Sequence, residues 1–485
     1  MLPLAALLVL QLGDLPDVSR AGYRGGQEPP RLERTVDARG FGVVPDDDVD
    51  DAPAIQKALD ETRGPAAIVL PPGRLILGRP LRIGSDGLVL RGSGSEGEGA
   101  TVLVCPRPLS ELNPDADAKK WSWSGGMVEI RPAKPASPGK AFRVERPADD
   151  GSRTFIADVP FFAKGPAPGV WYELTQKNDS KDTLLDWIYG GVVPKKRMGD
   201  ELRRRVGHNL RAWVHVVAVD GDRVTLEDPL PFPIRPEWTA RFARRTAIFE
   251  AGVEDLAFAF PETTYPGHLK EKGYNALQLQ DAIDCWVRNV HITNADSGVF
   301  VARSRRVTVT GVVLQGRMMH HALSASWASD CLITRWRMEA PHRHGTTVSW
   351  SAHNNVFSKG WGRELALDAH RATPFRNVHT DIEIVHGPSP RQPLRSGGGA
   401  DRGPHAAREN VYWNIRQRFE ADGETFVVDG LDEWPLATFA GWHGDREISL
   451  PVLGALRQTL LFANEAPAVV DLHLAQRADR AASGR

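Results

Sequence analysis

Hydrophobic and polar positions repeat in short units between Ala276 and Ile384. Four segments, which begin at Ala276, Gly298, Ala322 and Thr347, align with one another at spacings of about 22 to 25 residues. Each segment holds two short alternating runs separated by small or polar residues, which is typical of strands rather than helices. A unit this short cannot bury its apolar side alone, so successive units must stack. The pattern therefore predicts an all-β solenoid, a parallel β-helix.

The aligned segments also predict three columns of stacked core side chains. The columns are Leu277, Val299, Leu323 and Val348; Cys285, Val307, Cys331 and Val356; and Val290, Val312, Trp336 and Trp361. The chain has only three cysteines, too few for a disulfide framework. We expect Cys285 and Cys331 to act as small buried hydrophobes in their column.

Residues 35 to 104 carry a family resemblance. The run TVDARGFGVVPDDDVDDAPAIQKALD begins at Thr35, and the run AIVLPPGRLIL begins at Ala67. They resemble the N-terminal signature of the pectate-lyase-like superfamily of right-handed parallel β-helices. The resemblance implies that fold and a broad tendency toward carbohydrate chemistry. Because the superfamily includes polysaccharide lyases, polygalacturonase-type hydrolases, epimerases and phage tailspikes, it does not name one reaction.

A short helix is predicted near Asp51–Thr62, after an acidic turn that suits the positive end of a helix dipole. Its apolar stripe can cover the open N-terminal end of the solenoid, as a terminal cap must. The stripe consists of Ala54, Ile55, Ala58 and Leu59.

The chain divides into five expected segments. These are a leader at 1–30, the N-terminal cap and first coils at 31–140, an inserted small β subdomain at 141–234, central coils at 235–400, and last coils with a C-terminal cap at 401–485. The apolar run Met1–Leu12 is too short to span a bilayer and resembles a signal-peptide core, so we expect a secreted or periplasmic protein. The end of the chain, from Asn464, resembles an uncharacterised C-terminal extension of some bacterial β-helix proteins.

The charge balance excludes some partners. The chain has 60 basic and 61 acidic residues and a net charge of −1. Bulk electrostatic attraction to nucleic acid or to a membrane surface is therefore not expected. We expect a monomer that works on its own.

Histidines gather in the segments that connect the predicted strands. His320 and His321, then His342 and His344, then His370 recur at about the spacing of one coil. Equivalent positions in stacked coils lie about 4.8 Å apart. These imidazoles should therefore share one patch on the flank of the solenoid.

The patch has the chemistry of an acidic-glycan lyase. Arg317, Arg343, Arg363 and Arg371 lie in the same segments, and guanidinium groups bind carboxylates in a forked geometry. Such cations favour neutral imidazoles, which accept protons. The combination suits β-elimination on a uronic-acid-containing polysaccharide, the expected partner.

Roles follow from the spacing of these residues. We expect His342 or His344 to remove the proton, and His320 or His370 to assist at the leaving oxygen. Arg363 and Arg371 should neutralise the substrate carboxylate. Further candidates for substrate binding are Arg317, His321, Arg343, Glu364, Asp368, Tyr265, Lys270 and Trp121. Trp121 or Trp123 could stack on a sugar face, or could pack a loop against the solenoid.

Other functions stay open. Hydrolysis needs two carboxylic acids, for which Glu339, Glu364 and Asp368 are candidates. The sequence identifies no definite cofactor, although calcium could bridge a uronate to Glu339, Glu364 or Asp368. A transition metal could bind His342 and His344 with His320 or His370, but adjacent arginines would repel it. A non-catalytic, tailspike-like module that binds glycans is the last alternative.

Overall fold

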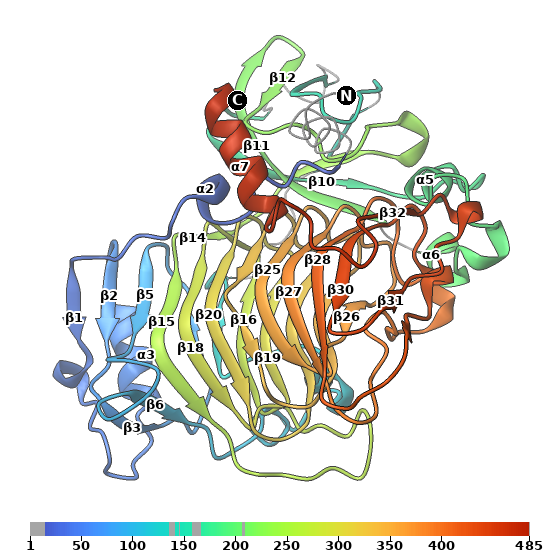
Figure 1. The fold of residues 1–485 in the computed structure, drawn as a ribbon. Coiled ribbons are helices and arrows are strands. Elements are labelled where there is room, and N and C mark those ends of the chain that lie inside the picture. The colour runs from blue at the N-terminus through green and yellow to red at the C-terminus, as the bar shows by residue number, and fades with distance from the viewer. Residues whose placement is uncertain (1–14, 135–140, 145, 158–165, 206–208, 485) are drawn as a thin grey trace.

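The protein is a right-handed parallel β-helix in a computed structural model that describes residues 15–134, 141–144, 146–157, 166–205 and 209–484. Two long parallel sheets run along the solenoid and face each other across its core (Figure 1). A third, shorter side connects them in the central coils. The predicted fold class is therefore confirmed. The narrower assignment to the pectate-lyase-like superfamily stays a prediction.

The first sheet is the longest. Its main path consists of β1 (Thr35–Asp37), β2 (Ala66–Val69), β5 (Leu88–Arg91), β15 (Gly252–Ala259), β18 (Trp286–Thr293), β20 (Thr308–Gln315), β22 (Leu332–Thr334), β25 (Val356–Arg363), β27 (Val378–His386), β28 (Val411–Phe419), β30 (Thr438–Gly444) and β32 (Thr459–Leu461). Beside this path lie β3 (Gly73–Ile76), β6 (Thr101–Val104) and β23 (Arg337–Met338).

The second sheet faces the first across the core. It consists of β4 (Leu81–Ile83), β7 (Val128–Ile130), β16 (Asn275–Gln280), β19 (Ser297–Ala302), β21 (Met319–Ser326), β24 (His342–Ser349) and β26 (Leu367–Ala369). The third side contains β14 (Ile248–Phe249) and β17 (Ala282–Ile283), continued by single bridges from Ile283 to Phe375.

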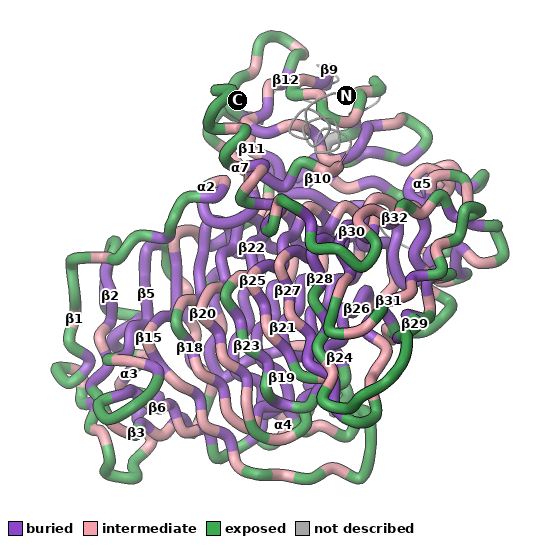
Figure 2. The backbone as a smooth tube through the Cα atoms, viewed as in Figure 1, coloured by how far each residue is buried: buried purple, intermediate pink, exposed green. Residues whose placement is uncertain are grey.

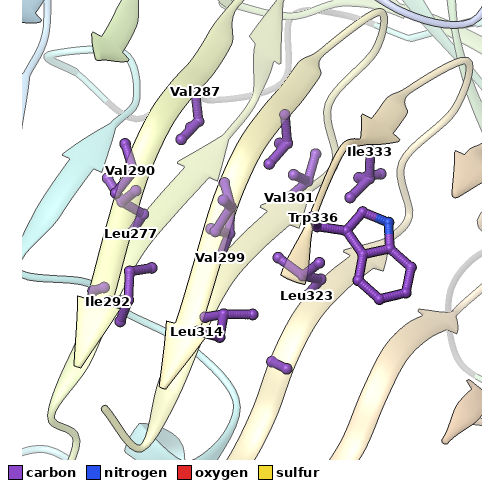
Figure 3. Close-up of a cluster of buried hydrophobic side chains, with 14 of the residues drawn as sticks. Leu277, Val287, Val290, Ile292, Val299, Val301, Leu314, Leu323, Ile333 and Trp336 are labelled. Atoms are coloured by element: carbon purple, nitrogen blue, oxygen red, sulfur yellow. The ribbon is translucent and has the colours of Figure 1, made fainter. Parts of the chain in front are cut away.

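Apolar side chains from the two long sheets fill the space between them. Figure 3 shows Val290, Ile292 and Leu314 of the first sheet opposite Leu277 and Val299 of the second. All are buried, and the burial continues from coil to coil along the axis (Figure 2). The stacked strands thus build one elongated core, as a repeat architecture requires.

The predicted columns are right for three coils and wrong for the fourth. Leu277 pairs with Val299 and Val299 with Leu323, but Leu323 pairs with Thr346, and Val348 lies one inward position further along. Thr346 can occupy the core because its Oγ1 lies 3.0 Å from Nε2 of His379 on the opposite sheet. A polar pair inside the solenoid therefore replaces the expected apolar residue.

The third column shows a similar shift. Trp361 pairs with Arg337 on the outer side, where the Arg337 guanidinium lies 4.1 Å from the Trp361 ring centre. Gly360 follows Trp336 in the core instead. A Cβ atom on Gly360 would lie only 1.9 Å from Cζ2 of Trp336. The indole ring fills the place of a side chain on the next coil, so glycine is required there.

Repeated polar and aromatic side chains also stack along the axis. Asn355, Asn377 and Asn410 form a buried ladder in which each side-chain amide donates to the next, at 2.9 and 3.1 Å. His379 stacks between Phe357 and Tyr412, with ring centres 4.8 and 4.9 Å apart. The asparagine ladder provides hydrogen bonds for buried amide groups, and the ring stack fills space in the core. Both repeat at the spacing of the coils.

The N-terminal end is capped as the sequence predicts. Helix α3 (Ala52–Glu61) buries Ala52, Ile55, Ala58 and Leu59 against the first coils. The acidic turn before it forms backbone hydrogen bonds: Asp50 accepts from Gly78 and Asp51 from Ile76. These contacts hold the turn against β3.

The two ends of the described chain meet on the outer face of the first sheet. Val18 and Ala21 pack there with Leu472 of helix α7 (Leu472–Ser483). Figure 1 shows α7 beside the short helix α2 (Tyr23–Gly26). Val18 and Ala21 therefore pack on the folded body, and the leader at 1–30 stays a prediction. The apolar run Met1–Leu12 lies outside the described residues.

A separate sheet protrudes from the solenoid where the sequence predicts an inserted subdomain. Its antiparallel strands, in spatial order, are β8 (Phe142–Arg143), β13 (Arg241–Arg244), β10 (Val170–Gln176), β11 (Leu210–Asp220), β12 (Arg223–Leu226) and β9 (Thr154–Ile156). Helices α5 (Thr183–Ile188) and α6 (Asp200–Arg203) lie beside it. Arg305 of the solenoid forms an ion pair at 2.8 Å with Asp228, which follows β12, and this contact links the sheet to the solenoid. None of the helices in the described ranges is long and apolar enough to span a bilayer.

The His379 imidazole makes stability sensitive to acid. Burial lowers the pKa of His379 to about 3, whereas an exposed histidine titrates near about 6.5. Between these values the unfolded chain binds one more proton than the folded chain. This contribution to stability is therefore complete above pH 6.5 and declines as the pH falls, by up to about 1.4 kcal/mol per pH unit.

We expect His379→Phe to lose the Thr346 contact and some stability at pH 7.5, yet to show a shallower fall of Tm between pH 6.5 and pH 4.5. Calorimetry across this range measures the slope. Tyr412→Phe is the matched control, because it alters the same ring stack without removing a group that titrates there. Equal slopes in His379→Phe and wild type would contradict this account.

Candidate active site

A pocket of about 770 Å³ lies on the outer side of the second sheet. Its floor is formed by β19, β21 and β24, and by the residues after β26. Residues 260–274, between β15 and β16, form one wall, and residues 387–410, between β27 and β28, form another. We call these the 260s loop and the 390s loop.

Five histidines meet in this pocket: His268, His320, His321, His344 and His370. The ring centres of His320 and His321 lie 4.7 Å apart, those of His321 and His344 4.6 Å, and those of His344 and His370 4.5 Å. The expected shared patch therefore exists. Three members lie on strands rather than loops: His320 and His321 on β21, and His344 on β24, where it pairs with His321.

Asp368 contacts two of these histidines. Its Oδ2 lies 3.1 Å from Nδ1 of His370 and 3.3 Å from Nδ1 of His344, while Oδ1 accepts a hydrogen bond from the Gly397 amide at 3.0 Å. The carboxylate is buried, which by itself would raise its pKa. The two imidazoles outweigh burial and hold the pKa of Asp368 well below its usual range. Asp368 is thus a fixed negative charge.

This contact orients both rings. With each Nδ1–H donated to the carboxylate, Nε2 of His344 and of His370 is left as the acceptor. Burial lowers the pKa of His344, and the neighbouring Asp368 offsets part of that effect. Side-chain exposure is 22% for His370 and 8% for His344. His370 is therefore the more accessible base of the pair.

A second carboxylate–histidine pair lies on the opposite side. Glu271 of the 260s loop lies 3.2 Å from Nδ1 of His320, and Nε2 of His320 lies 3.3 Å from Nε2 of His268. Burial would raise the pKa of Glu271, but its hydrogen bond with His320 outweighs this and lowers the pKa to about 2. The pocket thus holds two ionised carboxylates, each behind an imidazole.

His321 lies between the two pairs. Burial lowers the pKa of His321 well below its usual range, and the neighbouring His344 and His320 lower it further. Stacked imidazoles cannot all be charged at this distance, since like charges disfavour each other. His321 is therefore a neutral spacer in the row.

Arginines line the rim. Arg343, Arg391, Arg395 and Arg402 all contribute to the pocket wall. Arg391 donates to the backbone carbonyls of His342 and Arg343, and Arg402 forms an ion pair with Glu201 at 2.8 Å. Among the described residues, no carboxylate forms an ion pair with Arg343 or Arg395. These two cations can face an anionic ligand.

Glycine is required where the 390s loop covers the imidazoles. A Cβ atom on Gly397 would lie 2.5 Å from Cε1 of His344 and 2.8 Å from Cε1 of His370. The backbone therefore packs directly against both rings, and its amide reaches Asp368. The Gly-rich run of the sequence allows this close approach.

Of the two tryptophans considered for sugar stacking, only Trp123 lines the pocket. Trp121 is only 6% exposed and packs in the core against Leu109 and two glycines, whereas Trp123 is 47% exposed and lines the pocket. The packing alternative considered for Trp121 is therefore the one observed. Trp123, Phe300 and Trp350 give the pocket its aromatic surface.

His342 does not reach the pocket. Its Nδ1 donates to the Ala340 carbonyl at 3.0 Å, and its Nε2 accepts from the Ala366 amide at 3.3 Å. Burial lowers the pKa of His342 to about 4. Both ring nitrogens bind backbone, so His342 closes a turn and has no nitrogen left for a substrate.

Four predicted binding residues instead hold the two loops in place. Arg317 forms an ion pair with buried Asp296 at 2.7 Å, and the Tyr265 hydroxyl donates to the same carboxylate at 2.9 Å, which attaches the 260s loop. Glu364 accepts from the Arg391 amide at 2.7 Å, and Arg371 donates to the Gly398 carbonyl at 3.1 Å, which attaches the 390s loop.

The remaining predicted residues lie apart from the pocket. Arg363 is exposed and pairs with Glu420 at 2.6 Å. Glu339 pairs with Arg337, and Lys270 is an exposed residue that does not line the pocket. Neither Glu339 nor Glu364 belongs to a cluster of potential metal ligands within the described chain. Calcium binding through one of these carboxylates stays a prediction.

Several site residues were absent from the sequence prediction. They include His268, Glu271, Arg391, Arg395 and Phe300. Loop length is the signal that could have found most of them, because long loops in compact domains are often functional. The 260s and 390s loops are the long connections that return to the same face of the solenoid.

Comparisons with known proteins give only distant similarities. No protein-family model matches the chain, and no curated protein matches it. The tailspike gp61 of Pseudomonas phage phi297 is 10% identical, with a TM-score of 0.43, covering 90% of this chain and 81% of its own. The A-module of the Azotobacter vinelandii mannuronan C-5 epimerase AlgE4 is 13% identical, with a TM-score of 0.36, covering 89% and 99%. These similarities assign no reaction to the chain.

We expect Asp368→Asn to lower the pKa of His344 further, because the substitution removes the charge that favours its imidazolium. Nitrogen-resolved NMR titration of histidine-labelled protein measures this shift. Glu420→Gln, which removes an exposed carboxylate paired with Arg363, is the control and should leave the His344 titration unchanged. An unchanged or higher pKa in Asp368→Asn would show that Asp368 does not act on His344.

Proposed function

We propose that the protein is a polysaccharide lyase that cleaves an acidic, uronic-acid-containing glycan by β-elimination. One observation carries the proposal: Asp368 orients His370 in a pocket whose rim presents Arg343 and Arg395. A neutral, oriented imidazole is a proton acceptor, and the arginines bind a carboxylate.

The reaction balances with these groups. Arg343 and Arg395 bind the C6 carboxylate and thereby acidify the neighbouring C5–H. Nε2 of His370 takes the C5 proton, the C–H electron pair forms the C4–C5 double bond, and the C4–O bond breaks. The proton on His370 can then pass to the departing oxygen. Buried Asp368 stabilises the imidazolium while it exists.

The pocket favours elimination over hydrolysis. Glycoside hydrolysis needs two carboxylic acids directed at the glycosidic bond. Among the described residues that line the pocket, none is an aspartate or glutamate. Glu271 and Asp368 lie behind imidazoles and are held ionised, so neither suits the role of general acid.

A non-catalytic glycan-binding module is the second candidate. Trp123 and Phe300 support it, because ring faces pack against the apolar C–H surface of sugars. A binding surface alone does not need an oriented imidazole with a buried carboxylate behind it. The His370–Asp368 pair therefore favours an enzyme.

We expect the purified protein to release products with the ultraviolet absorbance of unsaturated uronates from at least one member of a panel of acidic polysaccharides. Neutral glucans are the controls. Reducing ends that appear without this absorbance would point to hydrolysis. Binding without any product would point to the non-catalytic module.

We expect His370→Ala to lower turnover on that substrate by about 10²–10⁴-fold, the usual contribution of a positioned general base. His342→Ala is the matched control: it removes a histidine from the same region that binds only backbone. It should lower stability and leave turnover per folded molecule nearly unchanged. Equal turnover in His370→Ala and wild type would exclude His370 as the base.

A further inference from the structure

Three histidines from three separate segments direct ring nitrogens at one point. His268 comes from the 260s loop, His320 from β21 and His344 from β24. One ring nitrogen of each lies within 4.8 Å of the other two. Three imidazoles are a common ligand set for divalent transition metals.

The closest pair already has the spacing of metal ligands. Nε2 of His268 and Nε2 of His320 lie 3.3 Å apart. With Zn–N bonds of about 2.0–2.1 Å, two ligands of a tetrahedral ion lie about 3.3–3.4 Å from each other. The observed separation therefore fits one edge of a zinc tetrahedron. His344 also places a ring nitrogen within 4.8 Å of both, and it must move closer to complete a face of the tetrahedron.

Two of the three imidazoles are supported from behind. Glu271 lies 3.2 Å from Nδ1 of His320, and Asp368 lies 3.3 Å from Nδ1 of His344. Metal-binding histidines almost always donate their second ring N–H to such a partner, which fixes the tautomer and leaves Nε2 for the metal. Glu271 and Asp368 place a carboxylate close to Nδ1 on both sides of the cluster, where it can accept such a hydrogen bond.

We propose that His268, His320 and His344 bind one divalent transition-metal ion, best matched by zinc, with its fourth position open to the pocket. Glu271 and Asp368 are the positioning residues for two of the ligands. Their negative charges offset the repulsion that Arg343 exerts on a cation in this region. Metal binding does not depend on the lyase proposal. Only its role would rest on that proposal: the open position could take the substrate carboxylate.

A second arrangement competes for the same ion. His344, Asp368 and His370 also place ligand atoms within 4.8 Å of one another. In that case Asp368 would bind the metal directly and His268 would play no part. Variants of His268 and His370 therefore separate the two sites.

The test uses the untagged full chain, stripped with a chelator and then titrated with Zn²⁺ alone by calorimetry and with Co²⁺ alone by visible absorption. We expect one ion per chain and the intense bands of tetrahedral Co²⁺. His268→Ala should weaken binding at least tenfold. Because His268 is exposed, this variant should fold normally. Glu271→Gln should weaken binding by about 10–100-fold, as expected for the partner of a metal ligand.

His370→Ala and His291→Ala are the controls. His370 lies in the same pocket outside the proposed ligand set, and His291 lies on β18 in the other long sheet. Both should keep the affinity of the wild type. Absence of binding, or equal affinity in His268→Ala and wild type, would overturn the proposal. Loss in His370→Ala with retention in His268→Ala would assign the ion to the competing arrangement.

The outcome also separates this proposal from the proposed function. Binding of Zn²⁺ through His268 without release of unsaturated uronates would support the metal site and contradict the lyase proposal. Cleavage at full rate by a chelator-treated chain that binds no Zn²⁺ would support the lyase proposal and contradict the metal site.

Discussion

Parallel hydrogen bonding between successive coils constrains everything else in this molecule. It places each residue one strand spacing from its equivalent in the previous coil, so each side chain must pack against the side chain at the same position of the next coil. In the core, valines, asparagines and aromatic rings meet this condition by packing or pairing with their own kind. On the flank, the same rule places His321 on His344. Two imidazoles at this distance favour the neutral form, which is the form that accepts protons or binds metals.

The sequence predicts the architecture well because apolar residues recur at a regular spacing. The paired Leu277, Val299 and Leu323 confirm this, and so does the helix that covers the first coil. The prediction fails at the fourth coil, where Thr346 is buried. A threonine is acceptable in that core only because His379 faces it from a distant strand. Such a pair has no local signal, so apolar alignment moved the register by two residues.

The site is harder to predict, since polar residues in connecting segments can serve either a ligand or the loop itself. Arg317, Glu364 and Arg371 have the residue types of a substrate site, yet each holds a loop by an ion pair or a backbone contact. The residues that face the pocket, such as His268 and Arg395, lie on those loops. Spacing by coil length found the histidines on the strands. It could not find side chains whose position depends on how a long loop folds back.

The in-register pairing of β21 and β24 also bears on how such a protein can change its length over evolution. Solenoids grow and shrink by whole coils, and a coil added before β4 or after β28 would leave the spatial relation of the strands that line the pocket intact. A coil added between His344 and Asp368 would separate these two residues by a further strand spacing and break the cluster. The pocket therefore fixes the number of coils between the strands that line it.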